Sequence, residues 1–107
     1  MDAVLLYVTC ASQDEATRIG RTVVEEWLAA CGNIMPGALS IYRWQGQVCE
    51  AGEAILVLKT RTALADTLTR RIRELHSYDC AGITVLPIQG GNPDYLAWIH
   101  DSTETVG

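Results

Sequence analysis

The chain has 107 residues, the usual size of one folded domain, so we expect a single domain over residues 1–107. Its 49% hydrophobic and 20% charged residues are typical of a globular protein and argue against disorder. The net charge of −5 argues against nucleic acid as a partner, because nucleic-acid-binding proteins carry basic faces. The sequence has no basic, apolar leader and no apolar run of roughly 20 residues, which predicts a cytoplasmic protein without a membrane partner.

The first predicted elements are a strand and a helix. Residues Ala3 to Cys10 form a nearly continuous apolar run, which is typical of a strand buried on both faces. Ser12 and Glu15 have the spacing of a capping box at a helix start. Apolar residues then recur every three or four positions, which predicts a helix from about Gln13 to Ala30 that ends at Gly32.

Two extended segments follow, from about Asn33 to Trp44 and from about Gln47 to Thr60. Pro36-Gly37 predicts a bend or bulge in the first segment, and Ala51-Gly52 predicts a kink in the second. The residues between Trp44 and Gln47 indicate a tight hairpin turn, with glycine where positive φ is needed.

A second helix is predicted from a Thr62 cap to about His76, followed by a strand from Ile83 to Ile88. A short terminal helix then begins at Asn92 or Pro93. The order β-α-β-β-α-β plus a tail helix predicts an α+β ferredoxin-like sandwich, with one four-stranded sheet and two helices on one face.

The predicted hairpin is long for so small a domain, and it leaves backbone groups without partners. Tyr42 and Trp44 lie near its tip, where little core is available to them. Aromatic residues of this kind are enriched at interfaces, so the sequence predicts strand pairing between subunits and hence an oligomer.

The motifs give little support for catalysis. Phosphate-binding glycine loops are absent from the sequence, and a catalytic pair of a cysteine or serine with a histidine would have only His76 and His100 as its base. We therefore predict a protein that is not an enzyme and has no organic cofactor. The four widely spaced cysteines form no C-x-x-C pair and are expected to be free thiols. Thiolate and imidazole suit copper or zinc, but spacing alone cannot bring Cys10 and Cys31 together. His76 also suits the capping of a helix C-terminus, and His100 is expected to be solvated.

Several segments in order resemble the CutA divalent-cation tolerance family. They are Tyr7-Val8-Thr9-Cys10, Leu28 to Gly37, Ser40 to Gly46, Ile55 to Thr60, His76-Ser77-Tyr78-Asp79, Val85 to Ile88, and Gly91 to Ile99. The resemblance covers nearly the whole chain. It implies a ferredoxin-like homotrimer whose long hairpins pair across subunits, similar to the nitrogen-regulatory signalling trimers. It also implies tolerance of divalent metals, with copper or another divalent ion bound and no established catalytic activity.

The resemblance also assigns residues. It implies Cys10, Cys31 and His76 as candidate metal ligands. It further implies an intersubunit cleft, which we expect to be lined by Lys59, Tyr78, Asp79 and Trp98. The chain departs from the family at Ser77, where proline is usual, at Asp79, where glutamate is usual, and at Ala81-Gly82, which replace Pro-Glu. We expect the fold to survive these changes, while Gly82 should loosen the backbone and the missing glutamate should alter the cleft.

Three other functions stay open at this stage. One is a signalling trimer whose clefts bind a small anionic metabolite through Lys59, Arg61 and backbone amides. Another is a small phosphatase, which Thr9 to Gln13 do not support because they offer no anion-cradling arginine. The last is an inert, stable trimer that anchors partner proteins.

Overall fold

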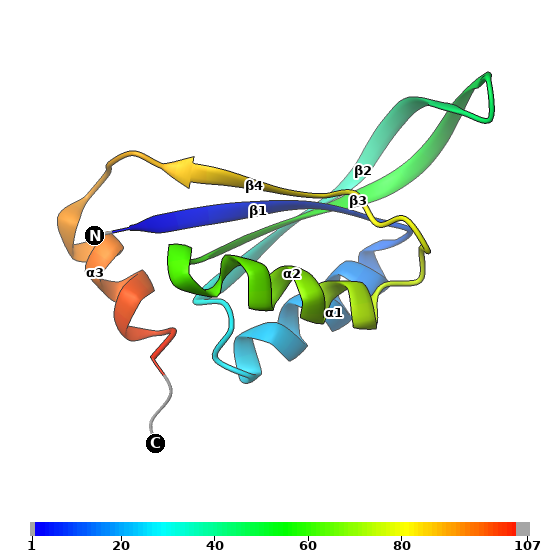
Figure 1. Ribbon diagram of the computed structural model, residues 1–107. Helices are drawn as coiled ribbons and strands as arrows, with labels where there is room; N and C mark the ends of the chain where they lie inside the picture. Colours follow the sequence, from blue (N-terminus) through cyan, green and yellow to red (C-terminus); the bar gives the residue numbers. More distant parts are fainter. Residues whose placement is uncertain (1, 105–107) are drawn as a thin grey trace.

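A computed structural model describes residues 2–104 of the chain (Figure 1). The elements follow the predicted order. They are β1 (Ala3–Cys10), α1 (Gln13–Glu25), β2 (Cys31–Trp44), β3 (Gln47–Arg61), a 3₁₀ turn (Thr62–Leu64), α2 (Ala65–Leu75), β4 (Ile83–Ile88) and α3 (Pro93–Asp101). Residues 1 and 105–107, which belong to the predicted domain range, lie outside the described part.

The strands form one antiparallel sheet in the order β2-β3-β1-β4, which is the predicted ferredoxin-like arrangement. Helices α1 and α2 cover one face of this sheet, and α3 lies at the end where the chain begins (Figure 1). The β2–β3 hairpin extends beyond the opposite end of the sheet, so the molecule measures 45 × 27 × 22 Å.

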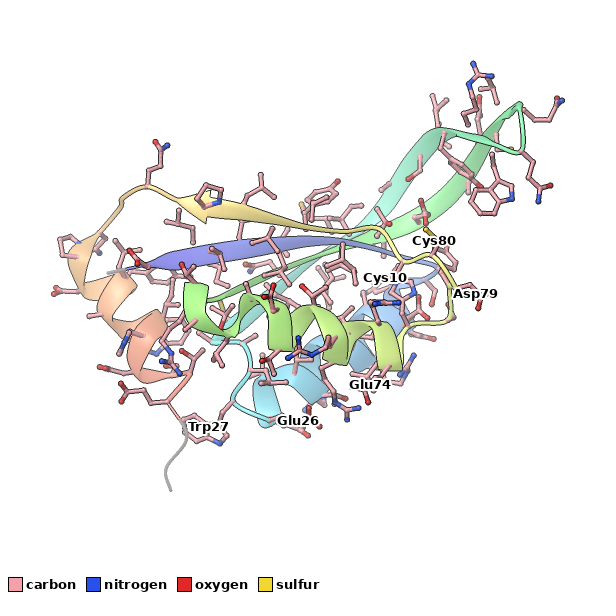
Figure 2. All side chains as sticks on the ribbon, in the orientation of Figure 1. Cys10, Glu26, Trp27, Glu74, Asp79 and Cys80 are labelled. Carbon is pink, nitrogen blue, oxygen red and sulfur yellow. The ribbon has the colours of Figure 1, made fainter. Side chains whose placement is uncertain are left out.

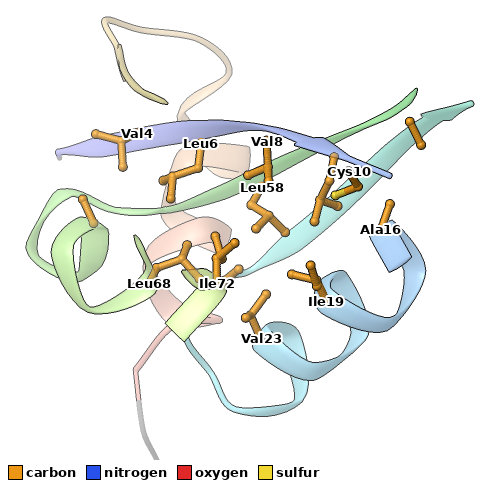
Figure 3. Packing of buried hydrophobic residues seen from close by; sticks show 14 residues of the cluster. Val4, Leu6, Val8, Cys10, Ala16, Ile19, Val23, Leu58, Leu68 and Ile72 are labelled. Carbon is orange, nitrogen blue, oxygen red and sulfur yellow. The ribbon is translucent and has the colours of Figure 1, made fainter. Parts of the chain in front are cut away.

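The hydrophobic core lies between the sheet and the two helices (Figure 3). Every second side chain of β1 points into it, including Leu6 and Val8, because side chains alternate between the faces of a strand. These residues meet Ile19 of α1 and Ile72 of α2, all fully buried. Fully burying such a side chain contributes roughly 1.5–3 kcal/mol, which makes this layer the main source of stability.

The first helix is shorter than predicted. It ends at Glu25, and Trp27 takes a left-handed conformation with φ of 64°. The backbone N–H of Ala30 then donates to Lys59 O at 2.8 Å, which begins the pairing of β2. Strand pairing therefore replaces the helical pattern after Glu25. Gly32, the expected helix end, lies inside β2, where an added Cβ would stand 3.1 Å from Leu58 Cδ2.

The second helix also differs at its start. Thr62 does not cap α2 but begins the 3₁₀ turn, with its N–H donating to Asp2 O at 3.1 Å. At the other end His76 is the cap residue, one position beyond the last helical residue. The chain therefore leaves β3 as a 3₁₀ turn, which is wound more tightly than an α-helix, and α2 begins only at Ala65.

The structure of the hairpin confirms the turn and the bulge that the sequence predicts. Gln45 and Gly46 have φ of 50° and 80°, as a two-residue hairpin turn requires. The register shifts between Met35 and Ala38, which confirms the bulge at Pro36-Gly37. At Ala51-Gly52, where a kink was expected, both residues pair in regular register with Ser40 and Leu39.

The sheet face opposite the helices is bare within this chain (Figure 1). Tyr7, Met35 and Leu86 are each more than 40% exposed there. The prediction that β1 is buried on both faces is therefore wrong for the isolated chain, since only the helix side is covered. Among the described residues, none of the helices combines the length and the apolarity that crossing a membrane requires.

Candidate functional site

Cys10, Glu15 and His76 form a compact cluster where three elements meet. Cys10 is the last residue of β1, Glu15 is in the first turn of α1, and His76 follows α2. Their ligand-type atoms lie within 4.8 Å of one another. The structure thus brings Cys10 and His76, two of the predicted metal ligands, together with a carboxylate that the sequence did not assign.

Both ring nitrogens of His76 already have partners inside the protein. Its side chain is fully buried, and Nε2 lies 2.7 Å from the carbonyl oxygen of Thr9. The N–H of Tyr78 lies 3.0 Å from Nδ1. A carbonyl can only accept and a backbone N–H can only donate, so these partners give Nε2 the role of donor and Nδ1 the role of acceptor. His76 therefore joins the end of β1 to the end of α2.

Both oxygens of the Glu15 carboxylate also have hydrogen-bond partners inside the protein. Its Oε1 accepts from Ala11 N–H at 2.9 Å and its Oε2 accepts from Ser77 N–H at 2.9 Å. Burial alone would raise the pKa of Glu15, but the hydrogen bonds from Ser77 and Ala11, together with His76, hold it below its usual value. Glu15 is thus an ionised side chain that ties α1 to the segment after α2.

Cys10 is a poor thiolate in this environment. It is fully buried, and burial, followed by the nearby charges of Glu15 and Glu53, raises its pKa to about 11. Metal ligation requires a deprotonated sulfur and a free histidine nitrogen. The cluster does not fit a metal ion as it stands, because Cys10 holds its proton while Glu15 and His76 are committed to backbone groups.

Cys31 lies far from this cluster in the same chain. Cys10 pairs with Ala54 of β3, whereas Cys31 pairs with Lys59, five positions further along that strand. At about 3.4 Å per residue this separates them by roughly 17 Å along the sheet. The structure therefore does not bring Cys10 and Cys31 together within one chain.

Cys31 belongs to a second, partly exposed cluster. Its Sγ lies 3.6 Å from the hydroxyl oxygen of Tyr95, to which Lys59 Nζ donates at 3.2 Å. The Tyr95 ring in turn packs against Trp98, with ring centroids 5.5 Å apart. Lys59 and Trp98, two of the expected cleft residues, thus gather around Tyr95 on α3, a residue that the sequence interpretation placed only in a helix.

The other two expected cleft residues lie at the opposite end of the sheet. Tyr78 and Asp79 are in the segment between α2 and β4. Asp79 lies below the base of the hairpin (Figure 2). The Tyr78 hydroxyl donates to Glu53 Oε2 at 2.9 Å. Burial and this carboxylate raise the pKa of Tyr78 to about 12. Within one chain the four residues therefore form two separate pairs.

A model of the CutA1 divalent ion tolerance protein family matches residues 4–102. The chain belongs to the CutA1 family. It is 46% identical over 103 residues to the "Divalent-cation tolerance protein CutA" of Thermus thermophilus, covering 96% of this chain and 99% of that protein. It is 43% identical over 100 residues to the mouse "Protein CutA", covering 94% of this chain and 56% of the mouse protein. The chain therefore spans about half the length of several relatives that it matches.

Solved structures of CutA1 family members have the same fold. The crystal structure of CutA1 from Oryza sativa superposes with a TM-score of 0.94 at 39% identity, covering 97% of this chain and 95% of that one. The Thermus thermophilus protein superposes with a TM-score of 0.91 at 45% identity, covering 97% and 100%. These neighbours confirm both the predicted fold and the family resemblance.

The alternative ligand, an anionic metabolite, has weak support in the geometry of this family member. Arg61 was expected to bind it, but its Nε donates to Thr103 Oγ1 at 3.0 Å and its Nη2 donates to Thr103 O at 2.9 Å. Lys59 donates to Tyr95 and lies 5.2 Å from the centroid of its ring. Both cations are thus engaged with α3 and the residues after it.

Proposed function

We propose that this protein supports tolerance of divalent cations by binding metal ions, copper among them, as a homotrimer. It would act in the cytoplasm without catalysis and without an organic cofactor. The observation that carries the metal-binding part is the partly exposed Cys31 thiol, the accessible member of the predicted ligand set. The similarity to the "Divalent-cation tolerance protein CutA" of Thermus thermophilus supports the proposed biological role.

Self-association is supported by two apolar surfaces that one chain leaves uncovered. Leu39, Ile41 and Val48 on the hairpin are each about two thirds exposed. Tyr7, Met35 and Leu86 lie exposed on the bare face of the sheet. Surfaces of this size and kind mark interfaces in soluble proteins. A trimer that buries both would also pair the projecting hairpin strands.

Metal binding would then depend on assembly. A single soft ligand holds a divalent ion weakly, and structural or transport sites use several donors around the metal. Among residues 2–104, neither group of three ligand-type side chains that lie close enough to hold a metal ion includes Cys31. The proposed site therefore requires donors from more than one subunit.

The test is an anaerobic titration of the reduced protein with Cd²⁺ and with copper, followed by gel filtration and metal counting. Cd²⁺ is included because it binds thiolates without oxidising them. We expect saturable binding that is lost in Cys31→Ser and retained in Cys10→Ala. Binding that survives in Cys31→Ser, or that disappears in Cys10→Ala, would contradict the assignment to Cys31.

A second pair of variants tests the dependence on assembly. Ile41→Asp places a charge on the exposed apolar side of the hairpin and should yield monomers by light scattering, with loss of metal binding. Gln45→Asp adds the same charge at the turn, where no apolar surface is removed, and should remain trimeric. A trimeric Ile41→Asp protein, or a monomer that binds metal as well as the wild type, would overturn the assembly argument.

A further inference from the structure

A second group of ligand-type side chains lies at the C-terminal end of α3. His100 is in the last turn of this helix, Asp101 is its last residue, and Glu104 follows shortly after it. One ligand-type atom of each residue lies within 4.8 Å of the other two. The group combines an imidazole with two carboxylates and contains no thiol, and it is separate from the buried cluster around His76.

The distances within this group suit a metal ion. His100 Nδ1 lies 3.3 Å from Glu104 Oε1 and 3.9 Å from Asp101 Oδ1. Nitrogen and oxygen donors bind zinc at about 2.0–2.2 Å, so two donors on one ion stand roughly 3–3.5 Å apart. His100 and Glu104 already have this spacing. Asp101 needs to move by about 0.5 Å, and its side chain is 80% exposed, which leaves room for that movement.

The charge around these donors favours a cation. Within residues 2–104, the ion-pair partner of both Asp101 and Glu104 is His100, and neither carboxylate pairs with a lysine or arginine. The end of α3 adds to this negative charge, because the dipole of a helix favours cations at its C-terminus. One protonated imidazole balances only part of the charge. A divalent ion held by the same atoms would balance it more fully.

The group also lies away from the surfaces that we propose to be buried by assembly. Figure 1 shows α3 on the side of the sheet that carries α1 and α2, at the end opposite the hairpin. Trp98, which is expected to line the intersubunit cleft, precedes His100 by two positions. Two positions correspond to a rotation of about 200° around an α-helix, so the two side chains point to nearly opposite sides of α3. The group therefore remains open to solvent in the proposed trimer.

We propose that His100, Asp101 and Glu104 form a second metal site, which binds a divalent transition-metal ion such as zinc. Imidazole and carboxylate are established zinc ligands, and water can complete the coordination of the ion. Mg²⁺ and Ca²⁺ prefer sites built from oxygen ligands alone, so they fit this set less well. The site differs from that of Cys31 because it needs no thiol and takes all three side chains from one chain. It goes beyond the proposed function and does not rest on it.

Histidine ring signals in NMR spectra test the site at equilibrium, because the chain contains only His76 and His100. Equilibrium matters because binding must order exposed side chains, which weakens the site, and such a site is not expected to retain its ion through gel filtration. The experiment is a titration of the assembled protein with Zn²⁺, in which His100→Gln identifies the His100 signal. We expect a saturable change in the His100 signal and none in the His76 signal. Mg²⁺ at the same concentrations should leave both unchanged. No saturable change at His100, or equal changes with Mg²⁺ and Zn²⁺, would overturn the proposal.

Matched variants locate the carboxylate ligands. Asp101→Asn and Glu104→Gln should each weaken Zn²⁺ binding at His100 by at least about tenfold, since even the loss of an outer partner of a metal ligand costs about that much. Glu25→Gln should leave binding unchanged, because Glu25 is an exposed carboxylate on α1 that pairs with Arg21. An unchanged His76 signal would show that each variant remains folded. Equal effects of Glu104→Gln and Glu25→Gln would contradict the assignment.

Cys31→Ser separates this site from the site proposed at Cys31. This variant should lose retained copper and Cd²⁺, yet its His100 signal should respond to Zn²⁺ with the affinity of the wild type. A wild-type protein that retains no copper would therefore contradict the Cys31 site and leave this one standing. A His100 signal that no longer responds to Zn²⁺ in Cys31→Ser would overturn the proposal of a separate site.

Discussion

Replacing Glu15 with glutamine should destabilise the fold more than its small chemical change suggests. The buried carboxylate accepts one N–H on each oxygen, from Ala11 and from Ser77. A glutamine side chain keeps one acceptor but turns an NH₂ group toward the other donor. One buried N–H then loses a charge-assisted partner and faces another N–H. Losing such a bond and leaving its donor unpaired costs about 2–4 kcal/mol.

The pH dependence of this loss of stability provides a second, independent test of the role of Glu15. The pKa of Glu15 in the folded protein lies below its ordinary value of 4.5. The stabilisation by the carboxylate is therefore fully present above the unfolded pKa and is lost as the pH falls through the folded pKa. The difference in stability between the wild type and Glu15→Gln should accordingly shrink as the pH falls below about 4.5.

Urea denaturation at fixed protein concentration measures both quantities, since the stability of an oligomer depends on concentration. Glu25→Gln is the matched control, because Glu25 ends the same helix with its side chain 66% exposed. It should change the free energy of unfolding by less than about 0.5 kcal/mol. If Glu15→Gln behaves like Glu25→Gln, or if its effect is the same at pH 7 and at about pH 3, the reasoning is refuted.

Three further changes test other parts of the structure. Leu58→Ala should lower the free energy of unfolding by about 2–5 kcal/mol in urea denaturation, because it opens a cavity at a fully buried core position; a loss below about 1 kcal/mol would contradict this packing. Gly82→Ala should cost about 1–3 kcal/mol, because its Cβ would lie 2.7 Å from Thr9 Oγ1. Thr9→Ala should rescue it, and Gly90→Ala, where nothing lies within 4 Å, should be neutral. In a time course of thiol labelling read by mass spectrometry, exposed Cys80 should react first and Cys10 only after unfolding; comparable rates would show that Cys10 is accessible.

Much of the fold could be predicted from local patterns. The element order, the hairpin turn and the bulge at Pro36-Gly37 follow from alternation, helical periodicity and residues that suit special backbone angles. The end of α1 could not be predicted in this way. Trp27 and Ala30 continue the helical spacing, but Ala30 donates to Lys59 O, a contact between residues 29 positions apart. Such a contact is absent from any local window of sequence.

The position of Gly82 shows a similar limit. Where the family resemblance suggests glutamate, glycine was expected to loosen the backbone. In the structure its carbonyl accepts from Thr9 N–H at 3.1 Å, and the space for a Cβ is occupied by the Thr9 side chain. Gly82 therefore permits a close approach between two segments that are distant in sequence. Ser77 also permits a contact between distant segments, because its N–H donates to Glu15 Oε2. Proline, which is usual in the family at this position, would have no N–H to donate.

The sequence identified the candidate metal ligands, but it did not show whether their ligand atoms are free to bind a metal ion. A thiol and an imidazole suggest a metal site, and Cys10 and His76 do lie close together. What decides their availability is the partner of each atom: Thr9 O and Tyr78 N–H for His76, and burial for Cys10. Thr9 belongs to β1 and lies 67 positions from His76, so this contact depends on the tertiary fold.

The bulge in β2 explains how one hairpin can present two different surfaces. Before the bulge, Met35 pairs with Ile55 and lies on the bare face of the sheet. Continued alternation would place Leu39 and Ile41 on that same face. Pro36 and Gly37 instead oppose a single residue, Ala54, so the phase of β2 shifts by one position. Tyr42 and Trp44 then follow Met35 onto the bare face, next to Glu53. The aliphatic residues move to the other side, beyond the ends of the helices. The bulge thus gives the projecting hairpin an aromatic side that continues the bare face of the sheet and an aliphatic side that faces away from it.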